Sequence, residues 1–393
     1  MATTRRLGHD NARRGDRRVW HDAPPAPRAS RVQVRRRHAR LVRCGLATLL
    51  VAVTALAMAP SAKAKSSLST RLPRWHVLPS AGGATFRTLA AVSGQTAWIG
   101  SDFGTVQRTV DGGRSWQDVS PPGTAGLHFR DLHARDAYRA VAMTAGSGTD
   151  SRVYSTSDGG HSWRLAYQAT DPAAFFDAMA FFDPRRGLIV SDPIGGRFQV
   201  LSTADGGNTW TVLPNGGMPP AQPDEYGFAD SGTMLTTAGQ DAWFGSGGSA
   251  SRVFHSHDGG YTWDVTSTPI LSGSPEGTAG IYGLAFRTAR LGLAVGGDFL
   301  TPDITSHVAA VSYLGHPWTS PAREPSGVRF AAAWLPFTLA TAVTVGINGS
   351  DVSYDAGQHW ARFDDGEFNT VSCAADGTCW AAGDAGRVAV LRR

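Results

Sequence analysis

One eight-residue pattern recurs along this chain and constrains what it can fold into. The Asp residues of successive copies are 47, 47, 53 and 97 residues apart, and the last step is two periods of about 48. The five copies run over Thr109–Trp116 (TVDGGRSW), Thr156–Trp163, Thr203–Trp210, Ser256–Trp263 and Ser353–Trp360. A degenerate copy, Ser312–Trp318, fills the wide gap and keeps the Ser, a Gly and the Trp but lacks the Asp. Repeats of this length are typical of propeller blades.

The residue types within each copy predict a tight turn between two strands. An Asp side chain can accept hydrogen bonds from the backbone of a turn, and Gly adopts positive φ at little cost. The Trp offers a large apolar side chain that can pack against a neighbouring unit. We therefore expect the five Asp residues to cap turns and not to act in catalysis: Asp111, Asp158, Asp205, Asp258 and Asp355.

The pattern S/T-x-D-x-G-x-S/T-W resembles the Asp-box, or BNR repeat. That repeat is found in sialidases, in sortilin-type receptors and in photosystem II assembly factors of the Ycf48 kind. The resemblance extends from Trp75 to the C-terminus. It implies a β-propeller fold, in which the box is a structural turn remote from the binding face.

Seven Trp residues each begin one unit, which predicts an all-β, seven-bladed β-propeller. They are Trp75, Trp116, Trp163, Trp210, Trp263, Trp318 and Trp360. The last unit ends one strand short, whereas the strand around Trp75 has no unit before it. We expect residues 74–79 to pair with residues 386–391, because that pairing completes the last blade and leaves no free sheet edge in the ring.

The first 64 residues are expected to direct export. An Arg-rich segment precedes the apolar run Leu46–Ala59, and Ser61–Ala64 forms a cleavage site of the A-x-A type. We expect cleavage after Ala64, a secreted or extracytoplasmic propeller over residues 65–393, and no membrane span after cleavage.

The basic character of the chain comes from the exported segment. Of the 37 Lys and Arg residues, 14 precede residue 65, against three of the 32 Asp and Glu residues. Residues 65–393 therefore carry 23 basic and 29 acidic side chains, a net charge of about −6. This balance lacks the basic footprint of a nucleic-acid-binding protein.

Two cysteines remain after the expected cleavage. Cys373 and Cys379 flank a short segment that predicts a hairpin turn, and Cys44 lies in the signal segment. We expect a disulfide across this turn in an oxidising compartment. A zinc pair is the lesser alternative, because no further Cys or His lies at finger spacing.

Polar and charged residues gather in loops that a propeller would place opposite the boxes. These are the loops between the second and third strands of each unit and the openings of the innermost strands, and we expect Glu225 and Tyr226 at one of these openings. Convergence of such groups from several blades predicts a polar binding face. The ligand-binding candidates are Arg87, Asp102, Arg130, Asp131, Arg152, Asp177, Asp192, Arg197, Glu225, Arg252, Asp298 and Arg329. The alternative is that these Arg–Asp pairs only lock neighbouring blades together.

No catalytic set is assigned. Sialidases need three arginines, a carboxylic acid and a Tyr–Glu pair. The arginine triad could be imitated by Arg87, Arg130 and Arg329, and the Tyr–Glu pair by Tyr226 beside Glu225. The F/Y-R-I-P motif of those enzymes is absent, and seven units exceed the sialidase six. If the protein is an enzyme, a glycoside hydrolase or lyase, the candidates are Asp131, Asp177, Glu225 and Tyr226.

No cofactor and no metal are assigned. His255 and His257 share a strand face as metal ligands do, but His257 occupies a variable position of a box and is expected to face solvent. We therefore expect an exported, monomeric binding or assembly module with a protein or carbohydrate ligand at its channel mouth. The alternative is a secreted carbohydrate-active enzyme that uses carboxylates and arginines there.

Overall fold

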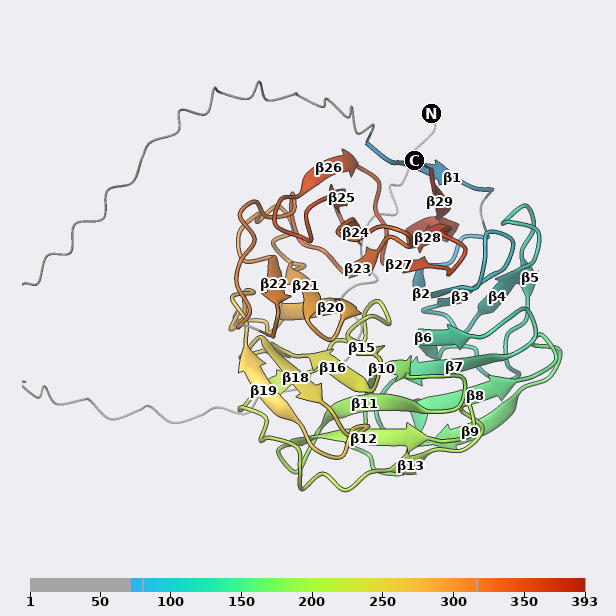
Figure 1. The fold of residues 1–393 in the computed structure, drawn as a ribbon. Coiled ribbons are helices and arrows are strands. Elements are labelled where there is room, and N and C mark those ends of the chain that lie inside the picture. The colour runs from blue at the N-terminus through green and yellow to red at the C-terminus, as the bar shows by residue number, and fades with distance from the viewer. Residues whose placement is uncertain (1–71, 80, 316, 393) are drawn as a thin grey trace, which may run out of the picture. The chain divides into compact units, whose positions relative to one another are not determined.

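The computed structural model describes residues 72–79, 81–315 and 317–392, and these form seven β-sheets around a central channel (Figure 1). The expected signal segment, its cleavage point and Cys44 lie outside the described residues. Within the described ranges, no helix has the length and hydropathy needed to cross a membrane. The predicted all-β, seven-bladed propeller is confirmed.

Each of the first three blades is an antiparallel sheet whose strands run outward from the channel in chain order. Blade 1 holds β2 (Phe86–Ala91), β3 (Ala97–Ser101), β4 (Val106–Thr109) and β5 (Gln117–Asp118). Blade 2 holds β6 (His128–Ala134), β7 (Ala140–Ala145), β8 (Arg152–Thr156) and β9 (Arg164–Gln168). Blade 3 holds β10 (Phe176–Phe181), β11 (Gly187–Ile194), β12 (Arg197–Thr203) and β13 (Thr211–Val212).

The other four blades follow the same plan with two departures, an enlarged fifth sheet and a closed seventh. Blade 4 holds β15 (Leu235–Ala238), β16 (Asp241–Gly245), β18 (Arg252–Ser256) and β19 (Asp264–Ser267). Blade 5 holds β20 (Ala279–Thr288), β21 (Leu291–Asp298) and β22 (Ala309–Tyr313), with β14 (Glu225–Tyr226) and β17 (Gly247–Gly248) added. Blade 6 holds β23 (Ala331–Trp334), β24 (Ala342–Gly346), β25 (Gly349–Ser353) and β26 (Ala361–Asp364). Blade 7 holds β27 (Thr370–Cys373), β28 (Cys379–Ala382), β29 (Val388–Arg392) and β1 (Arg74–Val77).

The N-terminal strand closes the ring, as predicted. β1 pairs antiparallel with β29, from Arg74 opposite Arg392 to Val77 opposite Ala389. The indole of Trp75 lies buried against Phe368, and its Nε1 donates a hydrogen bond of 2.9 Å to Ser350 Oγ in blade 6. β1 therefore supplies the outer strand of blade 7 and also ties that blade to its neighbour.

The five recurrent turns join the third and fourth strands of their blades and share one hydrogen-bond pattern. In the first, Asp111 Oδ1 accepts bonds from Thr109 Oγ1 at 2.8 Å and from the Ser115 amide at 3.0 Å. The Gly113 amide donates to Thr109 Oγ1, and Gly113 has a φ of 78° that a side chain would strain. The carboxylates of Asp158, Asp205, Asp258 and Asp355 accept the equivalent bonds. Hydrogen bonds from Ser115 and Thr109 lower the pKa of Asp111 to about 2.

Seven buried apolar layers lie between successive blades. Trp210 of blade 3 packs with Val141 and Met143 of blade 2, and Trp263 of blade 4 packs with Leu188 of blade 3. Trp360 fills the layer between blades 5 and 6 in the same way. The repeated Trp therefore anchors each unit against the preceding blade, because burial of so large an apolar surface favours the packed ring.

The fifth and seventh blades depart from the common plan in local ways. Blade 5 has the degenerate repeat, and its fourth strand is reduced to a bridge between Val311 and Thr319. In blade 7 the predicted disulfide is confirmed: Cys373 and Cys379 face one another in β27 and β28 and are covalently joined.

Candidate functional site

A cluster of charged side chains lies at the end of the channel opposite the recurrent turns. Asp102, in the loop after β3, accepts a hydrogen bond from Arg87 Nε at 3.2 Å on Oδ2, and its Oδ1 forms an ion pair with Arg130 Nη2 at 3.0 Å. Arg87 and Arg130 stand near the starts of the inner strands β2 and β6, and His128 Nδ1 lies 3.7 Å from the same carboxylate. Burial alone would raise the pKa of Asp102, but His128, Arg130 and Arg87 outweigh it and lower the pKa to about 2.

A fifth member of this channel-face cluster, Asp230, comes from the link between blades 3 and 4. Its Oδ1 lies 3.0 Å from Arg87 Nη1. Burial lowers the pKa of Arg87, but the negative charges of Asp230 and Asp102 outweigh this effect and raise it. Burial raises the pKa of Asp230 despite the two arginines. A strand and a loop of blade 1, a strand of blade 2 and an inter-blade link thus bring two cations, two carboxyl groups and an imidazole together.

The same link crosses the channel. Ser231 is buried, and its hydroxyl lies 2.9 Å from the Phe330 carbonyl of the blade 5–6 link, while its own carbonyl accepts from Thr370 Oγ1 of blade 7 at 2.9 Å. The Thr233 carbonyl accepts from the Leu284 amide of blade 5 at 2.8 Å. Residues 230–233 therefore contact blades on several sides, and we call this segment the channel plug.

Asp131 and Asp177, two catalytic candidates, lie beneath this cluster and are enclosed. Asp131 Oδ2 accepts from the Met179 amide at 2.7 Å, and burial raises the pKa of Asp131 to about 8. Asp177 is fully buried, and within the described part of the chain neither of its carboxyl oxygens has a hydrogen-bond partner. Burial, with the negative charge of Asp192, raises the pKa of Asp177 well above its ordinary value. Both side chains are buried, and their burial favours the protonated form.

Replacing Asp131 with Asn is expected to stabilise the protein increasingly as pH rises. Asp131 ionises near pH 4 in the unfolded chain but only at about pH 8 in the fold, so wild-type stability falls through that window. Asn keeps an oxygen for the Met179 amide and cannot ionise. Urea titrations near pH 5 and pH 8 should show the variant gaining roughly 1–3 kcal/mol on wild type at the higher pH. An equal difference at both pH values would contradict a protonated Asp131.

Glu225 and Tyr226 were assigned to the opening of an innermost strand, and that assignment is wrong. They form β14, which pairs with β17 on the sheet of blade 5, and β15 is the innermost strand of blade 4. Neighbouring residues of a strand point to opposite faces, so Glu225 meets Arg252 Nε at 2.8 Å while the Tyr226 hydroxyl donates to the Gly277 carbonyl. The two side chains therefore do not act on one ligand.

Arg329 lies apart from Arg87 and Arg130. It is fully buried, with its Nε 2.9 Å from Asp351 Oδ2 and its Nη1 2.7 Å from Asn348 Oδ1. The three arginines that could imitate a sialidase triad are therefore not brought together. Enclosed among protein partners, Arg329 is not part of the channel-face cluster.

The remaining candidates bind their own loops or the links between neighbouring blades. Arg152 and Arg197 begin the third strands of blades 2 and 3 and donate to the carbonyls of Thr149 and Met218. Asp298 accepts from Thr278 Oγ1 at 2.7 Å and from the Leu300 amide. Asp192 Oδ1 accepts from the Gly227 amide at 2.9 Å. These contacts shape the loops of the channel face.

Sequence reasoning missed Asp230, His128 and the channel plug. One signal was available, because the repeat step from Asp205 to Asp258 is 53 residues and the two before it are 47. The extra residues belong to a unit whose long link contains β14 and the plug. Spacing could locate an insertion, but it could not show that the insertion enters the channel.

Comparisons with known proteins identify the fold. No protein-family model and no curated protein sequence matches the chain. Among solved structures, "YCF48 bound to D1 peptide" is 15% identical with a TM-score of 0.56, over 82% of this chain and 97% of that one. YCF48 from Cyanidioschyzon merolae is 12% identical with a TM-score of 0.55, over 80% and 98%. The Pan2 WD40 domain of Neurospora crassa is 16% identical with a TM-score of 0.55, over 78% and 89%. At these identities the likeness establishes a β-propeller fold alone.

Proposed function

We propose that this protein is an exported Asp-box propeller that binds a segment of another protein at its channel face. The channel-face cluster carries this proposal, because cations and carboxyl groups from separate parts of the chain converge there. A surface with both signs of charge suits a polypeptide, which offers charged side chains together with backbone donors and acceptors. The solved structure of YCF48 bound to a D1 peptide has a similar fold, and this analogy supports the proposal that the present propeller binds a polypeptide.

Arg130 and His128 are the members of the cluster that a ligand would meet. The Arg130 side chain is 20% exposed and that of His128 is 49% exposed; the Arg87 side chain is 24% exposed, but it is paired with both Asp102 and Asp230. A guanidinium binds a carboxylate in a bidentate manner, so an acidic side chain or a C-terminal carboxylate of the partner would lie beside Arg130.

Burial of the acid–base candidates favours binding over hydrolysis. Asp131 and Asp177 are enclosed, and Glu225 is held by Arg252. A glycosidase needs two carboxyl groups that reach the same glycosidic bond. A ligand that binds at this site is therefore expected to dissociate from it without being hydrolysed.

The test is a titration of labelled peptides measured by fluorescence anisotropy. The set contains Glu-rich and Lys-rich peptides, each with a free and an amidated C-terminus. We expect the acidic peptides with a free C-terminus to bind most tightly, more weakly at high salt, and at least about tenfold more weakly to Arg130→Gln. Arg114→Gln is the matched control, because Arg114 is an exposed arginine of a recurrent turn on the opposite face.

Two results would overturn the proposal. One is equal peptide affinity for wild type, Arg130→Gln and Arg114→Gln, which would place binding elsewhere. The other is turnover of fluorogenic glycosides that is abolished by Glu225→Gln or Asp177→Asn, which would favour the carbohydrate-active alternative. Export is tested separately, by finding whether the mature protein outside the cytoplasm begins at Lys65.

A further inference from the structure

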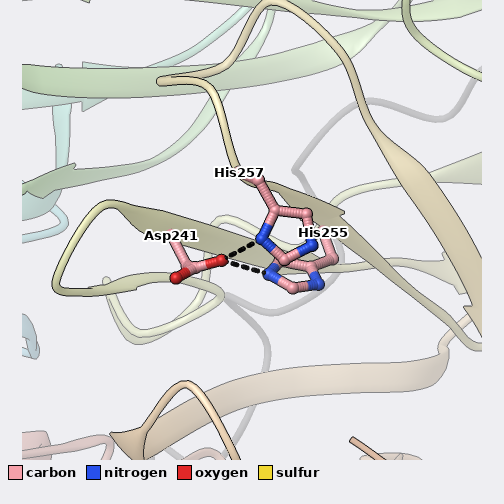
Figure 2. Close-up of side chains that lie close together, drawn as sticks. All are labelled: Asp241, His255 and His257. Atoms are coloured by element: carbon pink, nitrogen blue, oxygen red, sulfur yellow. Dashed lines mark hydrogen bonds and ion pairs between the residues drawn. The ribbon is translucent and has the colours of Figure 1, made fainter.

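Two histidines and an aspartate converge on blade 4, on the face of the sheet near its recurrent turn (Figure 2). His255 Nε2 lies 2.8 Å from Asp241 Oδ1, and His257 Nδ1 contacts the same oxygen. One possible ligand atom from each residue lies within 4.8 Å of the other two. From the sequence alone no metal is assigned to these histidines, because His257 occupies a variable position of a recurrent turn and is expected to face solvent; Asp241 joins them only in the structure.

Sheet register explains the convergence. Ala242 in β16 pairs with Ser256 in β18, which sets Asp241 beside His257 across the two strands. Alternation along a strand puts His255 and His257 on one face. The buried Trp243 stacks on the His255 imidazole, with ring centroids 4.5 Å apart and an interplanar angle of 17°. The backbone and this stacking therefore hold the ligand atoms in place before any ion binds.

The repeat provides an internal comparison. Register places Arg139, Ser155 and Ser157 at the equivalent positions of blade 2. In blade 3 the equivalent residues are Arg186, Ser202 and Ala204. Neither set can coordinate a metal, yet both blades make the same turn with the same hydrogen bonds. The turn itself therefore does not require two histidines and a carboxylate in blade 4.

We propose that Asp241, His255 and His257 bind a divalent transition metal ion of the zinc class. Two imidazole nitrogens and one carboxylate oxygen are donors that zinc accepts, whereas Mg²⁺ and Ca²⁺ prefer oxygen ligands alone. Ligand atoms around tetrahedral zinc lie about 3.3 Å apart, so the carboxylate and imidazoles need to separate by only ~1 Å. His257 has a side chain that is 67% exposed, which leaves a coordination position open to water or to a partner's side chain.

A neighbouring acid adds to the attraction for a cation. Asp264 in β19 lies directly opposite His255, so its side chain belongs to the same face of the sheet. Together with Asp241 it gives this small area two carboxylates. The site lies beside the recurrent turn of blade 4, on the side of the propeller opposite the channel-face cluster, and is independent of the proposed peptide binding.

Isothermal titration of zinc chloride into the tag-free full chain tests the proposal. We expect one zinc ion per chain at this site, with at least a tenfold loss of affinity in His257→Gln and in Asp241→Asn. His161→Gln is the matched control, because His161 is an exposed histidine of the equivalent turn in blade 2. Magnesium chloride should give no binding, and circular dichroism should show that each variant remains folded.

Cobalt(II) offers a second readout, because its visible absorption reports the geometry of the bound ligands. Tetrahedral cobalt bands that are present in wild type and His161→Gln and lost in His257→Gln would support the proposal. Absence of zinc binding by the wild type would overturn it. Equal zinc affinity of wild type, His257→Gln and His161→Gln would do the same, since the ion would then be held elsewhere in the chain.

Discussion

Removing residues 1–79 is expected to leave a protein that does not complete its ring. β29 would become an exposed edge, since its pairing with β1 from Arg74 to Val77 would be lost. The buried indole of Trp75 and its hydrogen bond to Ser350 would go with it. Loss of a buried aromatic side chain alone costs about 3–5 kcal/mol. We expect a lower denaturation midpoint and aggregation, measured by urea titration and light scattering.

The control for this deletion is a chain that begins at residue 70. It lacks the expected signal segment and retains β1, so it should remain folded and monomeric at the same concentration. Wild-type stability in the chain that lacks residues 1–79 would be incompatible with closure by the N-terminal strand. A synthetic peptide of residues 72–79 added in excess should restore part of the lost stability, because it can occupy the vacant edge.

The substitution Arg329→Met should destabilise the protein by about 3–5 kcal/mol, because it leaves Asp351 buried and unpaired. Both side chains are almost entirely enclosed. Asp351 Oδ2 accepts from Arg329 Nε at 2.9 Å, and Arg329 Nη2 also donates to Ser326 Oγ at 2.8 Å. Met has a similar length but cannot satisfy the carboxylate. Urea titration at neutral pH measures the loss.

A double variant, Arg329→Met with Asp351→Leu, should recover most of that loss, because no buried charge then remains unpaired. Arg139→Met is the surface control. Arg139 pairs with Asp136 on an exposed loop, and such pairs contribute less than ~1 kcal/mol. A cost for Arg329→Met as small as that for Arg139→Met would mean that this pair is not structural. It would return Arg329 to the set of ligand-binding candidates.

The architecture could be predicted because it rests on local and periodic signals. Turn residues such as Asp111 and Gly113 act within a few positions of one another, and the same eight residues return at each blade. The last unit lacks one strand, and the segment around Trp75 has no unit before it. Because an open sheet edge is unfavourable, this segment is predicted to take the place of the missing strand. The disulfide could be predicted for a similar reason, since Cys373 and Cys379 flank a single hairpin.

The candidate site could be predicted only in part. Arg87, Arg130 and Asp102 were assigned to one face from their positions in the repeat, and the structure places them in contact. Exposure was not predictable, because Arg329 occupies a position similar to that of Arg87 and yet is fully buried. Whether a charged side chain faces a ligand or a neighbouring blade depends on what packs over it.

The sequence by itself determined the number of blades, the position of each recurrent turn and the way in which the ring closes, since these follow from pattern and period. Only the tertiary structure decided that the link before β15 enters the channel and that Asp230 meets Arg87 across 143 residues. It also decided that Asp241 contacts both His255 and His257. Sheet register and the course of the loops bring these residues together. Neither can be predicted from a local pattern in the sequence.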